Sequence, residues 1–130
     1  MPRDTEDEGL VLDAGVFIAL ERRSGFAASL IDQAKRTKVP LVTSAAVIAQ
    51  VWRGGGGKQT PIALALHHVD VVDLSRPVAR VLGLMLGRAG TTDAVDAHVA
   101  YLAVERDWTV VTSDPDDLVR LEPKLRVVRV

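Results

Sequence analysis

Apolar residues follow two alternating patterns along the chain. Short runs rich in Val and Leu are typical of buried strands, and they occur at residues 9–12, 39–43, 69–74, 108–112 and 125–130. The intervening segments place apolar residues three and four positions apart, which predicts helices over 15–22, 26–38, 44–52, 60–67, 76–88, 93–106 and 115–121. Strands and helices therefore alternate along the chain.

Several helix boundaries are marked by residues that cap or break helices. Thr91 or Thr92 would cap the helix over 93–106, since a short polar side chain before a helix satisfies its first backbone N–H groups. Four consecutive glycines at 54–57 would end the helix over 44–52 and form a flexible loop, because glycine has the largest backbone entropy to lose on ordering.

This alternation predicts an α/β protein of three layers, in which a mainly parallel central sheet carries helices on both faces. A chain of 130 residues has the length of one domain, so residues 1–130 are expected to form a single domain. Residues 1–8 are mostly polar and are expected to be a flexible arm. Apolar residues make up 48% of the chain and aromatic residues only 4%, so the core must be largely aliphatic.

Composition excludes several classes of protein. The chain has no cysteine, which rules out disulfides and thiolate zinc sites and fits a reducing cytoplasm. Its first residues do not resemble a secretion signal, and no apolar segment approaches the roughly 20 residues that a membrane helix needs. The net charge of −1 gives no overall basic signal for nucleic acid, which counts against a passive RNA-coating protein but not against a nuclease.

Aspartates stand at places that this fold would bring together. Asp13 ends the first strand, and Asp114 follows the strand over 108–112. Asp93 and Asp96 lie three positions apart at the start of a helix and therefore share one face. Because ligands of open α/β sheets bind beyond the carboxyl ends of the strands, we expect these four carboxylates to converge.

Converging carboxylates indicate a metal site. They repel one another, and burying them as anions is costly. A divalent cation removes that cost, and hard oxygen ligands favour Mg²⁺ or Mn²⁺, which can activate water and stabilise a phosphate during in-line displacement. Each aspartate alone also suits a structural role, since Asp93 would complement a helix dipole and Asp114, before Pro115, suits a turn or a helix cap.

Four segments resemble the PIN-domain family, and within it the toxin ribonucleases of VapBC-type toxin–antitoxin pairs. They occur in the family's order and span nearly the whole chain: VLDAG at 11–15, TSAAVIAQVWR at 43–53, TDAVDAHVA at 92–100 and VTSDPDDL at 111–118. Each segment is weak evidence alone, and the four together are fairly specific. The resemblance implies a PIN-like fold and an Mg²⁺- or Mn²⁺-dependent endoribonuclease.

The resemblance also implies roles for individual residues and partners. Asp13, Asp96 and Asp114 would be catalytic metal ligands, with Asp93 close by. Supporting roles would fall to four further residues, Thr112, Ser113, Asp116 and Asp117. Members of the family are usually homodimers, act on RNA, and are inhibited by a small cognate antitoxin that inserts a segment near the site.

Gln50 is a departure from the family's pattern, because a glutamate usually occupies this place. A glutamine removes one negative charge, although its amide oxygen can still accept a hydrogen bond from a metal-bound water or bind the metal weakly. Two hypotheses follow. The chain is an active ribonuclease with weaker metal affinity, or it is a catalytically degenerate PIN-fold module that binds RNA or protein.

Other residues have less specific interpretations. Arg22, Arg53 and Lys58 could contact RNA phosphates, or could be ordinary solvent-exposed charge. The apolar run over 81–86 could be part of a homodimer or antitoxin surface, or could be core. His98 lies two positions past Asp96 on a different helix face, so it is expected to pack or lie at the surface and not to act as a base.

Overall fold

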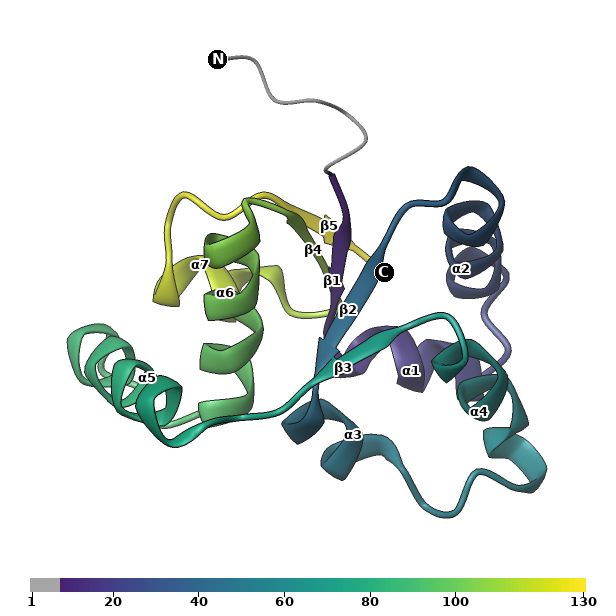
Figure 1. The fold of residues 1–130 in the computed structure, drawn as a ribbon, viewed down its shortest axis with the longest axis horizontal. Coiled ribbons are helices and arrows are strands. Elements are labelled where there is room, and N and C mark those ends of the chain that lie inside the picture. The colour runs from purple at the N-terminus through teal and green to yellow at the C-terminus, as the bar shows by residue number, and fades with distance from the viewer. Residues whose placement is uncertain (1–7) are drawn as a thin grey trace.

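The centre of the molecule is a parallel sheet. The computed structural model describes residues 8–130, and its sheet has five strands in the order β3-β2-β1-β4-β5, with every pair parallel (Figure 1). The strands are β1 (Leu10–Leu12), β2 (Leu41–Ser44), β3 (Asp70–Val72), β4 (Thr109–Thr112) and β5 (Val127–Arg129). Each lies within one residue of an apolar run of the sequence, although β3 and β5 are shorter than the runs that predicted them.

Helices cover both faces of this sheet, which confirms the predicted three-layer α/β/α fold. On one side lie α5 (Arg76–Ala89), α6 (Ala94–Arg106) and α7 (Pro115–Leu121), and on the other lie α1 (Ala14–Glu21), α2 (Gly25–Thr37) and α4 (Thr60–Leu66) (Figure 1). The helix α3 (Ala45–Val51) continues from the end of β2, and a short 3₁₀ helix, η2 (Gly57–Gln59), precedes α4. No helix within residues 8–130 is long and apolar enough to cross a bilayer.

Two local predictions need correction. The cap of α6 is Asp93, and not Thr91 or Thr92, because the Oδ1 atom of Asp93 accepts a hydrogen bond from the backbone N–H of Asp96 at 3.0 Å. A carboxylate at this position also complements the positive end of the helix dipole. The loop after α3 is shorter than predicted, since Gly57 already belongs to η2. The predicted arm falls mostly on residues 1–7, which lie outside the described residues.

The core lies on both faces of β1 and β4. Their side chains Val11, Leu12, Val110 and Val111 are fully buried, as expected for central parallel strands. Helix α6 is buried along much of its length, including four consecutive residues, 97–100. Each large aliphatic side chain buried in this way contributes about 1.5–3 kcal/mol of transfer free energy. This packing holds the first turn of α6 rigidly beside the carboxyl ends of the strands.

Candidate functional site

Asp13 links the central strand to the first helix. It follows β1 directly and occupies the cap position of α1, where its Oδ1 atom accepts a hydrogen bond from the backbone N–H of Ala14 at 2.8 Å. Its Oδ2 atom accepts a second hydrogen bond, 2.7 Å long, from the hydroxyl of Thr112 on β4. Only 5% of Asp13 is exposed, and this burial raises its pKa more than the two hydrogen bonds lower it. A buried carboxylate is therefore held in one orientation at the sheet edge.

Thr112 also organises the turn after β4. It is fully buried, and while its hydroxyl donates to Asp13 it accepts the backbone N–H of Asp114 at 3.0 Å. Asp114 occupies the position before α7, yet its exposed side chain makes no capping hydrogen bond with that helix. The side chain of Asp114 therefore does not perform the capping role that its place before Pro115 suggested. Its carboxylate is available to a ligand.

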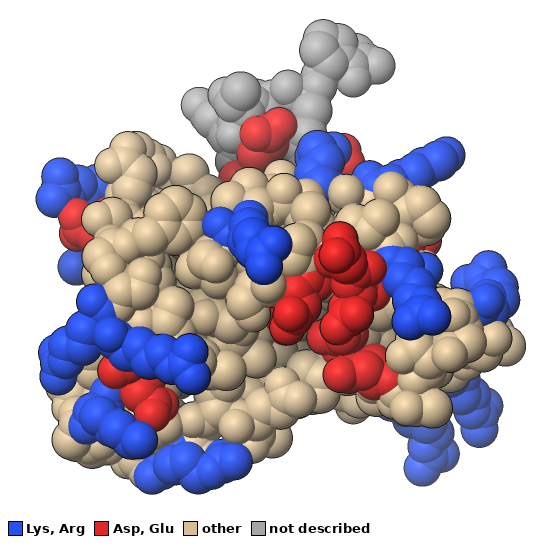
Figure 2. Space-filling model, turned by 180° about the vertical axis from the view of Figure 1, so that it is seen from behind, with Lys and Arg blue, Asp and Glu red and all other residues tan. Residues whose placement is uncertain are grey.

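Asp96 is the most strongly perturbed of the aspartates. It is half-buried in the first turn of α6, and its pKa is raised to about 7, first by burial and then by the negative charges of Asp13, Asp93, Asp117 and Asp114. The structure therefore brings all four predicted catalytic aspartates, together with Asp117, within electrostatic reach of one another. Figure 2 shows acidic side chains gathered into one patch on the face of the molecule seen there.

The close approach of α1 to the turn after β4 depends on Gly15. A Cβ atom at this position would lie 2.8 Å from the Cβ atom and 2.9 Å from the backbone nitrogen of Ser113, closer than such atoms approach in proteins. Ser113 is half-buried against this helix, one residue before Asp114. Only glycine permits the two elements to meet here, so Gly15 sets the separation between Asp13 and Asp114.

A buried pair of side chains holds α6 against β2. The Nδ1 atom of His98 lies 2.6 Å from the Oγ atom of Ser44, and His98 is 1% exposed. Because this Oγ atom already accepts the backbone N–H of Ala46 at 2.9 Å, its own hydrogen is available to His98. Burial lowers the pKa of His98 and keeps the ring neutral. The predicted packing role of His98 agrees with this position.

Gln50 lines a hollow whose walls include none of the four aspartates. This residue is exposed in the last turn of α3, and the hollow has a volume of about 320 Å³ and is also lined by Glu21, Arg53 and Lys58. The structure thus joins two of the predicted RNA-contacting residues to Gln50 in one hollow.

Two other residues stay outside both groups. Arg22, the third predicted RNA contact, is exposed beyond the end of α1. Asp116 is exposed on α7, and its charge is not among the main causes of the raised pKa of Asp96. Sequence reasoning gave no role to Gly15, Glu21 or Gln59, which the structure places beside the aspartates or in the hollow. Ser44, a hydroxyl residue directly before a helix, did have a signal in the sequence.

The aspartates fit a hard divalent cation by their chemistry. Their ligand atoms are carboxylate oxygens, which Mg²⁺ and Mn²⁺ prefer, and their mutual repulsion would be relieved by a positive charge. No three acidic or histidine side chains within residues 8–130 are gathered closely enough to hold an ion in their present positions. Asp13 and Asp93 use oxygens in hydrogen bonds instead. The side chains would have to rotate for binding.

Comparison with known proteins identifies the family. The chain matches the PIN domain over residues 10–122. It is similar in fold to VapBC2 from Rickettsia felis bound to a promoter DNA fragment (TM-score 0.71, 16% identity, 93% of this chain and 98% of that chain covered) and to DNA-bound VapBC from Salmonella typhimurium (0.68, 18%, 94% and 98%).

A third similar structure is PAE2754 from Pyrobaculum aerophilum (TM-score 0.67, 17% identity, 94% of this chain and 85% of that chain covered). A search of curated protein sequences gave no match. Identities this low establish only the fold, whereas the match to the PIN domain covers most of the chain and includes every strand but β5. The chain belongs to the PIN-domain family.

Proposed function

We propose that this protein is a metal-dependent endoribonuclease of the VapC toxin type, held inactive by a cognate antitoxin protein. The observation that carries the proposal is the gathering of carboxylates around Asp96, whose pKa is raised to about 7 first by burial and then by these negative charges. Helix capping alone would not require these aspartates to lie near one another. Strongly perturbed carboxylates at a sheet's carboxyl edge are typical of catalytic metal sites.

Each aspartate would have a defined task. Asp13, Asp96, Asp114 and Asp93 would hold Mg²⁺ or Mn²⁺, which would activate water and neutralise charge on the phosphodiester. Thr112 orients Asp13 by donating to its Oδ2 atom. The packing of α6, which is buried over residues 97–100, supports the position of Asp96, and the neighbouring Ser113 and Asp117 would bind water or substrate around the ion.

The proposed partners rest on the fold comparisons and on one surface. The similar Rickettsia and Salmonella structures are VapBC assemblies bound to DNA, which supports an antitoxin partner for this chain. Helix α5 buries Leu82 and Met85 but leaves Val81 41% and Leu84 70% exposed. The apolar run over 81–86 is therefore partly core and partly surface, and we assign the exposed part to the antitoxin or to a second copy of the chain.

Cleavage of RNA tests the activity. The purified chain is incubated with total cellular RNA in Mg²⁺ or Mn²⁺, with and without chelator, beside the Asp96→Asn variant. We expect metal-dependent cutting, and a loss of about 100-fold or more in the variant, since even an outer-shell partner of a metal is worth about 10- to 100-fold. Asp32→Asn is the matched control, because Asp32 is an exposed carboxylate on α2 paired with Arg36 at 2.6 Å. Cutting that chelator or Asp96→Asn leaves unchanged would contradict the proposal.

One observation favours a second function, that of a non-catalytic binding module. Gln50 replaces the glutamate usual in the family, and the carboxylates of the described chain do not form a closed metal cage. Titration calorimetry with Mg²⁺ and Mn²⁺ separates the two functions. Binding that disappears in Asp96→Asn supports the nuclease, whereas a folded chain that binds neither ion supports the module.

A further inference from the structure

The hollow beside Gln50 is lined by charged and polar side chains, and none of the four aspartates lines it. It has a volume of about 320 Å³ and lies where α1, α3 and the glycine loop meet. The lining residues that matter here are Ile18, Glu21, Gln50, Arg53, Lys58 and Gln59. Helix α1 connects it to the candidate metal site, because Asp13 caps the start of that helix and Glu21 ends it, about 12 Å away at 1.5 Å per residue.

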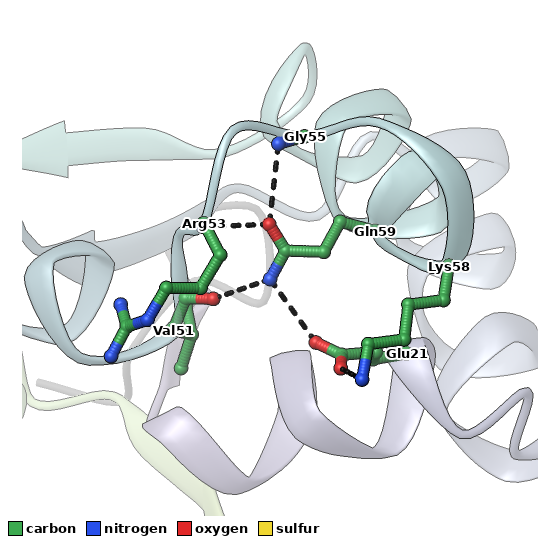
Figure 3. A network of polar contacts seen from close by, with 6 residues as sticks. All are labelled: Glu21, Val51, Arg53, Gly55, Lys58 and Gln59. Atoms are coloured by element: carbon green, nitrogen blue, oxygen red, sulfur yellow. Dashed lines mark hydrogen bonds and ion pairs between the residues drawn. The ribbon is translucent and has the colours of Figure 1, made fainter.

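Gln59 holds the wall of this hollow in place (Figure 3). It is 4% exposed, and its Oε1 atom accepts the backbone N–H groups of Arg53 at 2.6 Å and Gly55 at 3.2 Å. Its Nε2 atom donates to the carbonyl of Val51 at 2.7 Å and to the Oε2 atom of Glu21 at 3.2 Å. Both N–H groups and both lone pairs of the amide are therefore used.

The glycine loop follows a path that this amide stabilises. Gly54 and Gly55 have φ angles of +105° and +76°, and a Cβ atom on Gly55 would overlap the ring of Trp52. Side chains are thus excluded from the turn, which passes close to an aromatic ring and is tied at two N–H groups to Gln59. The loop predicted to be flexible is instead held by specific bonds, so the hollow exists before a ligand arrives.

The chemistry of the hollow suits the edge of a nucleobase better than a phosphate. Glu21 is fixed by Gln59 and lies 3.3 Å from the ammonium of Lys58, and these two partners lower its pKa, which keeps it ionised. A phosphate would meet that carboxylate at close range. Lys58 is 80% exposed on its side chain and can move aside, whereas Glu21 is 24% exposed and cannot.

The groups that remain form a mixed edge of acceptors and donors. The Glu21 carboxylate accepts hydrogen bonds, and the exposed amide of Gln50 can both accept and donate them. Lys58 can donate, as can the guanidinium N–H groups of Arg53 other than those of its Nη1 atom, which is bonded to the carbonyls of Ala49 and Trp52. Ile18, 41% exposed, offers an apolar surface for the flat face of a ring. Guanine matches this set, since the N1–H and N2–H₂ donors of its pairing edge face a carboxylate while its O6 and N7 acceptors face cations.

We propose that the hollow binds one unpaired guanine of the RNA substrate near the scissile bond, with Glu21 as the residue that reads the base and Gln59 as the residue that positions Glu21 and the loop. This inference rests on the proposed function, because it takes RNA as the substrate. It assigns sequence preference to a site distinct from the four aspartates. Unpaired bases are the part of RNA that proteins read most readily.

Binding of short RNAs by the inactive Asp96→Asn chain tests this inference without cleavage. Fluorescence anisotropy measures the affinity for UUGUU, UUAUU, UUCUU and UUUUU. We expect UUGUU to bind roughly tenfold or more tighter than UUUUU, as a bidentate base contact gives. Adding Glu21→Gln should abolish that difference and leave the affinity for UUUUU unchanged or higher, whereas the control Glu105→Gln, on the exposed side of α6, should keep it. Gln59→Leu should weaken the preference for G if its melting curve shows a folded chain.

Several outcomes would overturn the inference. Equal binding of all four RNAs by a folded chain, or a guanine preference that survives Glu21→Gln, removes the base-reading role. Affinity that falls equally for all four RNAs in Lys58→Ala, with no preference for G, assigns the hollow to the phosphate backbone. Guanine-selective binding by the Asp96→Asn chain, when the unaltered chain cuts no RNA, supports this inference and contradicts the nuclease, so the two proposals fail separately.

Discussion

Asp96 is a carboxylate whose pKa the folded chain raises to about 7. Burial and four neighbouring aspartates raise its pKa, and Asp13 is raised in the same direction mainly by burial. The native state without metal therefore carries an electrostatic cost at neutral pH. Under the proposed function, activity and stability would be opposed at this residue.

The pH dependence of stability follows from this shift. The pKa of Asp96 is about 7 in the folded chain, against an ordinary value of 3.8. Between these pH values the folded chain binds more protons than the unfolded chain, so the stability contributed by protonated Asp96 is lost as pH rises from about 4 to 7. Asn mimics the protonated side chain. We therefore expect Asp96→Asn to be more stable than the unaltered chain by about 1–2 kcal/mol at pH 7.5 with chelator, after allowance for solvent at a half-buried site, and nearly equal at pH 4.5.

Urea unfolding at the two pH values measures this difference. The lowered pKa of Glu21 acts in the opposite sense but is common to both chains, so it cancels in the comparison. An advantage of Asp96→Asn that is equal at both pH values would show that the carboxylate is not perturbed as described.

Two helices begin at the site, and each delivers its acid through a local device. Asp93 caps α6 and fixes the first turn that carries Asp96, while Asp13 caps α1. The packing of α1 against the turn after β4 depends on Gly15, where no side chain fits beside Ser113. The place of each acidic residue at the start of its helix therefore determines where its carboxylate lies in the candidate site.

Gly15→Ala tests this packing, with Gly83→Ala as its matched control. Both glycines are in helices, where alanine ordinarily stabilises by about 0.5–1 kcal/mol. A Cβ atom at Gly83 meets no other atom within 4 Å, so we expect that gain there. At Gly15 we expect a loss of about 1–3 kcal/mol through overpacking against Ser113, with weaker metal binding. Thermal unfolding measures both, and equal effects would contradict the close approach.

At the scale of the whole molecule, parallel pairing determines which residues meet. Because β1 and β4 are neighbours and run in the same direction, Asp13 and Thr112 lie side by side although 99 positions separate them. The α6 and α7 helices then cover one face and bring Asp96 and Asp117 to the same edge. The packing of the whole core must therefore offset the electrostatic repulsion among the gathered carboxylates.

A divalent ion should therefore stabilise the whole chain. Ligand that binds only the folded state adds about 2.7 kcal/mol at a concentration 100 times its dissociation constant. We expect the melting temperature to rise with Mg²⁺ or Mn²⁺ in the unaltered chain and in Asp32→Asn, and to rise much less in Asp96→Asn. Scanning calorimetry at several ion concentrations measures this effect, and an equal rise in all three chains would indicate weak binding elsewhere.

The sequence by itself determined the order of elements, the three-layer fold and the places of the acidic residues relative to strand ends. These depend on hydrophobic periodicity, which is a local property and can be read without neighbours in space. The helix over 93–106 was predicted nearly to its ends, and only its cap was misassigned, because threonine and aspartate are both good capping residues.

Only the tertiary structure decided how distant segments meet. The Ser44–His98 pair joins residues 54 positions apart, Gly15 is required because Ser113 lies against it, and Gln59 ties the glycine loop to Glu21. Nothing in the periodicity of the chain marks these positions, because each contact forms after the sheet has chosen its strand order. The glycine run is the clearest example, because its composition indicated flexibility, whereas the buried amide of Gln59 accepts hydrogen bonds from the backbone N–H groups of Arg53 and Gly55.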